Sequence, residues 1–215
     1  MNFRALIEFL RDLDDHNDKS WMDEHRDYYN GLRDDFEAWV GQLDERLRGI
    51  GGYVPTDPHD AVEQMNHNLL HHPDYPPYKT YVGAELGKSK TRPAFYVRVG
   101  LKNSMVAGGF HMPPSDVLKQ IRAAIDERGD ELVEIIHADR FRKTFGELDD
   151  TNALKTSPQG YDTDYEHIEL LRLKSYSVSR KLTQEEAMSD AFADNLVRDF
   201  QTLAPLNDWL AGAVK

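Results

Sequence analysis

Six proline residues in the middle of the chain limit most strongly what it can fold into. Each one lacks a backbone N–H and fixes φ, so a long helix cannot cross residues 53–111, although a short one over 61–65 is compatible with the spacing. Within this region, segment 95–99 is rich in β-branched and aromatic residues, and segment 105–110 follows it after a turn. We therefore predict a strand-rich centre that contains a hairpin of these two segments.

Apolar residues recur at helical spacing before this centre. One stripe covers residues 3–13, and a second runs from Trp21 to Leu47, after which glycines at 49, 51 and 52 end the pattern. Asn17 or Asp18 suits the N-cap of the second helix. Residues 1–50 are therefore predicted to form a helical hairpin.

Helical patterns return after the centre. A helix is predicted from residue 115 to a stop at Gly129, and two short ones begin at Asp130 and Asp139, the second ending at Gly146. A polar loop to residue 160, a helix at 166–173 and a strand at 175–179 follow. Thr183–Glu186 has the form of a capping box. The last stripe contains Phe192, Leu196, Phe200 and Leu203, with further apolar residues beyond Pro205.

These patterns predict one α+β domain over residues 1–215. It consists of a helical hairpin at 1–50, the strand-rich centre at 53–111, and helices plus one strand at 113–215. The expected architecture is a central, mostly antiparallel sheet flanked by N-terminal and C-terminal helices. The chain has no cysteine, which excludes disulfides and thiolate metal sites. No apolar run reaches membrane-spanning length and no signal-peptide pattern is present, so we expect a cytoplasmic protein.

Charge is distributed unevenly along the chain. With 26 basic and 38 acidic residues the net charge is −12, which argues against broad coating of nucleic acid. Residues 79–102, however, hold six basic residues against the single acid Glu85, and residues 172–181 hold four basic residues and no acid. Both segments are strand-like. If they are neighbours in one sheet, they form a positive patch that attracts an anionic ligand.

The function predicted from this patch is the binding of a small anionic, phosphate-bearing ligand. Lysine and arginine supply charge, and the paired glycines allow close approach of the backbone. The candidate ligand-binding residues are Tyr78, Lys79, Arg98, Gly108, Gly109 and Lys174. The alternative for the cations is ordinary pairing with acidic helices. Neither a cofactor nor an oligomeric state is indicated.

Two other functions are compatible with the sequence. One is an enzyme of unknown reaction in which Lys79, His71 or His111 acts as the acid–base group. The other is a protein-interaction module whose aromatic anchors lie on the long helices. Those anchors are Trp21, Tyr28, Trp39 and Trp209.

Two motif-like segments were weighed for phosphate and metal binding. Segment 83–89 has three residues between its glycines where a phosphate loop needs four, and Pro93 follows too soon for a helix, so a turn between strands explains it better. A histidine-rich segment could share one face of a helix and hold a metal, yet prolines bracket it and surface histidines are the expected outcome. Its members are His59, Glu63, His67, His71 and His72.

Several short segments in a fixed order carry a family resemblance. They include Pro77-Tyr78-Lys79 followed by Gly83, the pair Gly108-Gly109 followed by Pro113, and Leu171 to Ser175. In order and spacing these segments resemble the conserved-hypothetical family called domain of unknown function 2461. The resemblance implies a single α+β domain and a surface shared by these segments, and it supplies no reaction. Members usually carry an Arg-Asp-x-Arg-Phe-Ser-like run before Pro-Tyr-Lys, where this chain has residues 67–72 instead.

Overall fold

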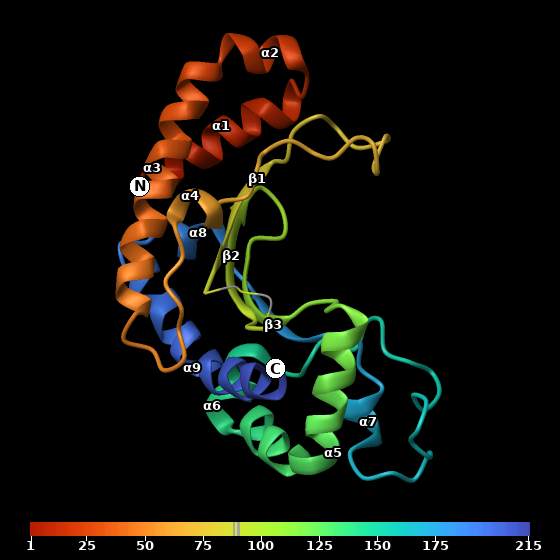
Figure 1. Cartoon of the computed structure of the whole chain (residues 1–215). Coiled ribbons are helices and arrows are strands. Elements are labelled where there is room, and N and C mark those ends of the chain that lie inside the picture. Colours follow the sequence, from red (N-terminus) through yellow and green to blue (C-terminus); the bar gives the residue numbers. More distant parts are fainter. Residues whose placement is uncertain (88, 90) are drawn as a thin grey trace.

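The computed structural model describes residues 1–87, 89 and 91–215 and contains one four-stranded sheet with helices packed around it (Figure 1). The N-terminal helices are α1 (Phe3–Asp15), α2 (Lys19–Glu24), α3 (Arg26–Leu47) and α4 (Pro58–Ala61). The strands are β1 (Tyr81–Leu86), β2 (Ala94–Gly100), β3 (Met105–Phe110) and β4 (Tyr176–Lys181). The remaining helices are α5 (Ser115–His137), α6 (Asp139–Phe145), α7 (Ile168–Leu171), α8 (Gln184–Ala187) and α9 (Phe192–Ala213). This arrangement confirms the predicted α+β class.

The sheet is an antiparallel meander in the order β1-β2-β3-β4. Its hairpin β2–β3 is the predicted one, and β4 contains the predicted strand at 175–179. The register aligns residues across all four strands. Since side chains alternate between the two faces along each strand, aligned residues share a face. Arg98, for example, lies opposite Gly83 on β1 and Met105 on β3. Rows of this kind determine which side chains meet on each face.

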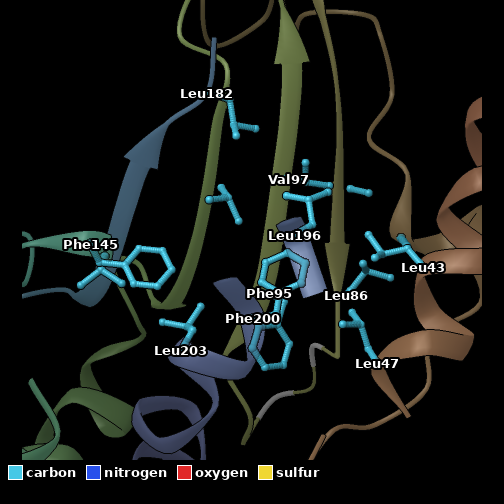
Figure 2. Packing of buried hydrophobic residues seen from close by; sticks show 14 of the residues in the cluster. Leu43, Leu47, Leu86, Phe95, Val97, Phe145, Leu182, Leu196, Phe200 and Leu203 are labelled. Atoms are coloured by element: carbon cyan, nitrogen blue, oxygen red, sulfur yellow. The ribbon is translucent and has the colours of Figure 1, made fainter. Parts of the chain in front are cut away.

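One face of the sheet carries the hydrophobic core. Phe95 and Val97 of β2 point toward Phe200 of α9, and the Phe95 and Phe200 ring centroids lie 5.0 Å apart (Figure 2). Leu43 and Leu47 of α3 close the side of this cluster next to β1. Figure 1 shows α3, α8 and α9 on this side of the strands. Burial of these side chains is the main force that holds the helices on the sheet.

The opposite face of the strands has no helix of the described chain over its centre (Figure 1). The α1–α2 hairpin lies beyond one end of the strands, and α5 with α7 lies beyond the other. We call this the open face. Its residues on β2 are Ala94, Tyr96 and Arg98, which alternate with the buried Phe95, Val97 and Val99.

Three helix boundaries differ from the predictions. The second N-terminal helix is divided at His25, whose imidazole donates to the carbonyl of Trp21 at 2.8 Å and stacks on its indole. The predicted stop near Gly129 is a local break at Arg128 inside α5 (φ −145°, ψ 40°), where the guanidinium lies over the ring of Trp209. Helix α9 continues through Pro205, which lies exposed on its outer side.

Two short predicted helices are shifted or shortened, and one strand was missed. The helix expected over 61–65 is α4, and the one expected over 166–173 is α7. Residues 83–86, predicted to be part of a turn, instead complete β1, and the turn begins at Gly87 with φ +73°. The β-forming pair Tyr81-Val82 was the available signal for this strand. The capping box at Thr183 and Glu186 is confirmed.

Candidate functional site

A cavity of about 600 Å³ lies on the open face of the sheet. Tyr96 and Arg98 of β2 line it together with Met105 of β3, and Ser177 and Ser179 of β4 form its far side. A volume in this range suits a small-molecule ligand. We call it the sheet cavity.

Small residues on β3 make the sheet cavity hollow. Ala107, Gly108 and Gly109 all line it. A Cβ atom on Gly108 would lie 2.1 Å from Leu203 Cδ2 on the core side, so glycine lets α9 approach the sheet. Gly109 has φ +100°, and a Cβ there would lie 2.1 Å from the carbonyl oxygen of Tyr176. Glycine is therefore required at both positions by close packing, against α9 at Gly108 and against the β4 backbone at Gly109.

A hydrogen-bonded network joins the cavity wall to the segment before β1. Lys79 Nζ donates to Glu63 Oε2 at 2.9 Å, and both side chains are largely buried. Burial and the adjacent Glu63 carboxylate, which accepts a hydrogen bond from the phenol, raise the pKa of Tyr96. Gly83 makes room for this contact, because a Cβ on it would lie 2.8 Å from the Tyr96 hydroxyl. Tyr96 therefore remains a neutral donor, and the Lys79 charge is neutralised by Glu63.

Arg98 is a cation in the lining of the cavity. Its Nε donates to the carbonyl of Asn103 at 2.9 Å, and its guanidinium lies 4.8 Å from the centroid of the Tyr81 ring. Among the ion pairs of the described residues, none involves Arg98. A guanidinium has five N–H donors in a planar fork, so donors remain for an anionic ligand.

The end of the cavity nearest α5 and α7 is acidic. The backbone N–H of Asp149 donates to the carbonyl of Ser177 at 2.9 Å, which fixes the loop to β4. Hydrogen bonds from the Thr151 hydroxyl (2.6 Å) and N–H (3.0 Å) lower the pKa of Asp149. His111 Nδ1 lies 3.7 Å from Asp149 Oδ2, and Glu147 lines the same end. This end therefore presents an ionised carboxylate beside an imidazole.

The six predicted ligand-binding residues do not all meet at this cavity. Arg98, Gly108 and Gly109 line it, and Lys79 lies behind its wall in the pair with Glu63. Tyr78 is 6% exposed, and its backbone N–H and carbonyl are both hydrogen-bonded by the Asn17 side chain. Lys174 is half-buried and is not among the described lining residues.

The two basic segments point partly to different faces. Arg180 lies on the core side of β4, where Asp199 of α9 and Glu186 of α8 pair with it at 2.7 and 2.9 Å. Arg172 pairs with Glu169 at 2.7 Å. Lys88 and Lys90 lie outside the described residues. Ordinary pairing with acidic helices thus accounts for part of the basic charge.

Tyr96 and Asp149 were not among the candidates from the sequence, and Glu63 was a candidate only as a member of the histidine-rich segment. Tyr96 had a usable signal, since it alternates with buried residues on the same strand as Arg98. Glu63 reaches the cavity because its N–H donates to the carbonyl of Gly83, and Asp149 because its N–H donates to Ser177. Contacts between a loop and a distant strand leave no periodic signal in a sequence.

The remaining candidates occupy other places. His59 lies 3.4 Å from Glu37, and His67 donates to the Pro76 carbonyl at 2.7 Å. The two imidazoles therefore contact different partners and do not face a common metal centre. Within the described residues, the one group with metal-ligand geometry is a different one, composed of Asp130, Glu166 and His167. Of the possible interaction anchors, Trp39 and Trp209 are buried in the core and Tyr28 is 54% exposed.

Comparison with known proteins gives a family and no further relatives. No curated protein and no solved structure matches the chain. Among the described helices, none is both long and apolar enough to cross a membrane. One family model, described as conserved hypothetical protein (DUF2461), matches residues 5–209. The match covers nearly the whole sequence, including every strand of the sheet and the residues of the cavity, and the chain therefore belongs to the DUF2461 family.

Proposed function

We propose that this protein binds a small ligand with an anionic, phosphate-bearing group in the sheet cavity. The observation that carries the proposal is Arg98, a cation in the lining of a 600 Å³ cavity whose ion-pairing capacity is not used within the described chain. Stacking on Tyr81 holds its guanidinium in place, so little side-chain freedom is lost when a ligand binds.

The surroundings of Arg98 support the same ligand. The paired glycines expose backbone further along the same cavity, and Met105 and Phe110 give the cavity apolar surface for the body of a ligand. Lys79 contributes indirectly, because its pair with Glu63 fixes the carboxylate that receives the Tyr96 hydroxyl. The proposed setting is the cytoplasm, and the proposed binding does not extend to broad nucleic-acid coating.

Binding can be tested with inorganic phosphate and simple phosphate monoesters. A ligand that binds only the folded protein raises the unfolding temperature, so thermal shift identifies binders and calorimetry gives their affinity. The variant Arg98→Met keeps an unbranched side chain, although a shorter one, and removes the charge. It should weaken binding by about tenfold or more, the usual contribution of a hydrogen bond to a charged group.

The matched control is Lys102→Met, which removes a positive charge from the exposed turn next to Arg98 without touching the cavity. Because Arg98 also holds the Asn103 carbonyl, unfolding of the ligand-free variant is measured alongside, and Arg98→Gln serves as a milder change. Equal affinity of the wild-type protein and both Arg98 variants for every phosphate that binds would refute the assignment. So would the absence of any phosphate binding.

An enzymatic function is the second candidate, and the pair of His111 and Asp149 favours it. Of the three acid–base candidates, His111 lines the cavity, whereas Lys79 is held by Glu63 and His71 lies on an exposed loop. A carboxylate near Nδ1 orients an imidazole for proton transfer through Nε2. If a bound phosphate ester is turned over, His111→Gln should abolish turnover and leave binding unchanged. Turnover that survives in His111→Gln would exclude this role.

A further inference from the structure

Opposite charges lie at opposite ends of the sheet cavity. Arg98 stands in the register row of Gly83 and Met105, toward the α1–α2 end of the strands. Asp149 is hydrogen-bonded to Ser177, which stands four rows further along, opposite Gly109. Four residues of β2 separate the rows, a length of about 13 Å at the usual rise per residue. The cavity is therefore electrically polar along the strands.

The acidic end is a preorganised cation acceptor. Two hydrogen bonds from Thr151 hold the Asp149 carboxylate in one orientation and leave its second oxygen facing His111. Glu147 lies at the same end, 85% exposed, with Arg142 at 3.5 Å as a weak surface partner. The site thus offers carboxylate oxygens that a ligand ammonium group can reach from the cavity.

Other charged groups also line the cavity. Arg92 precedes Ala94 in the turn between β1 and β2, at the same end of the strands as Ser177, and its Nη1 donates to the Gly52 carbonyl at 2.5 Å. Glu63 is neutralised by Lys79. Glu85 of β1, opposite Tyr96, also lines the cavity between its two ends. Arg98 and Asp149 are the charged groups that we assign to the ends of a ligand.

We propose that the ligand of the sheet cavity is an elongated zwitterion, with an anionic group on Arg98 and an ammonium group on Asp149 and Glu147. This inference rests on the proposed function and adds the second charge and the length of the ligand. The separation of the two ends requires on the order of 10 Å between the charges, given the span of the strands. Short dipolar molecules cannot contact both ends at once.

The probes are 8-aminooctyl phosphate and octyl phosphate, which have the same chain and differ in the ammonium group. Calorimetry should show the amino compound binding about tenfold more tightly, since one charge-assisted hydrogen bond is gained. For the short pair, 2-aminoethyl phosphate and ethyl phosphate, the ammonium group should give no gain. An additional arm with 8-aminooctanoate determines whether the anionic group is a carboxylate or a phosphate.

Two variants assign the ammonium contact. Asp149→Asn keeps an oxygen acceptor for Thr151 and should remove most of the tenfold gain of the amino compound over octyl phosphate. Asp150→Asn removes the same charge from the exposed neighbouring position and should keep the gain. Arg98→Met should weaken both long probes.

Each outcome decides between the two proposals. Equal affinity of the two long probes, with binding still dependent on Arg98, would overturn the zwitterion and leave the anion site standing. A gain that persists in Asp149→Asn and in the double variant with Glu147→Gln would also overturn it, because the ammonium group would then contact another part of the surface. No binding of any phosphate would overturn the proposed function itself.

Discussion

Substitution of Gly109 by alanine tests whether the floor of the cavity depends on this residue. Gly109 is a member of β3 with φ +100°, and its alanine Cβ would lie 2.1 Å from the Tyr176 carbonyl oxygen and 2.7 Å from Ser177 Cα. Both atoms belong to the backbone of β4, so no side-chain rotation relieves the contact. The strand pair must separate locally, or the β3 backbone must change its conformation.

The cost can be worked from these two effects. A side chain at positive φ costs about 1–2 kcal/mol, and forcing an extra carbon into a filled space costs about 1–3 kcal/mol. We therefore expect Gly109→Ala to lower the free energy of unfolding by about 3 kcal/mol. For a chain of 215 residues, this corresponds to a decrease in the unfolding temperature of about 6–12 °C.

A matched control separates the two effects. Gly160 has φ +94° and no atom within 4 Å of its added Cβ, so Gly160→Ala pays for the backbone conformation alone. Urea and thermal unfolding of both variants measure the difference, which should be about 1–3 kcal/mol. If Gly109→Ala is no less stable than Gly160→Ala, the close contact with β4 does not contribute and the reasoning is refuted.

Two further predictions concern the core side of the sheet. Asp199→Asn should lower stability by about 1–3 kcal/mol in urea unfolding, because the carboxylate is 13% exposed and pairs with Arg180. The control is Asp194→Asn, which should cost under about 0.5 kcal/mol because Asp194 is 64% exposed in its pair with Arg46. Glu186 has a pKa below its ordinary 4.5 because the Thr183 N–H and then Arg180 stabilise its charged form. The contribution of the Glu186 carboxylate to the free energy of unfolding is therefore complete above pH 4.5 and is lost as the pH falls through the lowered pKa. The free energies of unfolding of the wild-type protein and Glu186→Gln should therefore differ above pH 4.5 and converge below it. A difference in stability that instead increases as the pH falls would contradict this prediction.

Local sequence patterns were sufficient for the sheet hairpin and for most helices. Strand β2 was predictable because Phe95, Val97 and Val99 alternate with residues that face outward. Strand β1 was missed because two glycines and a Lys-Ser pair gave its C-terminal half the appearance of a turn. Gly83 is nevertheless a strand residue, and it is glycine because the Tyr96 hydroxyl and the Glu63 carboxylate approach it.

The face of the sheet to which a basic residue points depends on whether its position along the strand is odd or even, which we call its parity. The net charge of a segment does not contain this information. Arg98 has the parity of Tyr96 and faces the cavity, whereas Arg180 has the parity of the buried Tyr176 and Val178 and faces α9. A shift of one residue exchanges the faces. Parity applied to β4 would have predicted the pairing of Arg180 with a helix, and it would have removed that residue from the candidate patch.

The acidic half of the cavity was beyond sequence reasoning for a different reason. Asp149 and Glu63 are carried there by loops whose single backbone hydrogen bonds to Ser177 and Gly83 join segments far apart in the chain. Counting charge along the sequence indicated a net basic surface with Glu85 as its single acid, while the fold adds the carboxylates of Asp149, Glu147 and Glu63 from outside the strands. A surface with both signs of charge at fixed ends selects a ligand by its length as well as its charge, which a basic patch alone cannot do. If the cavity binds the zwitterion that we propose, its specificity should depend on the separation of Arg98 from Asp149.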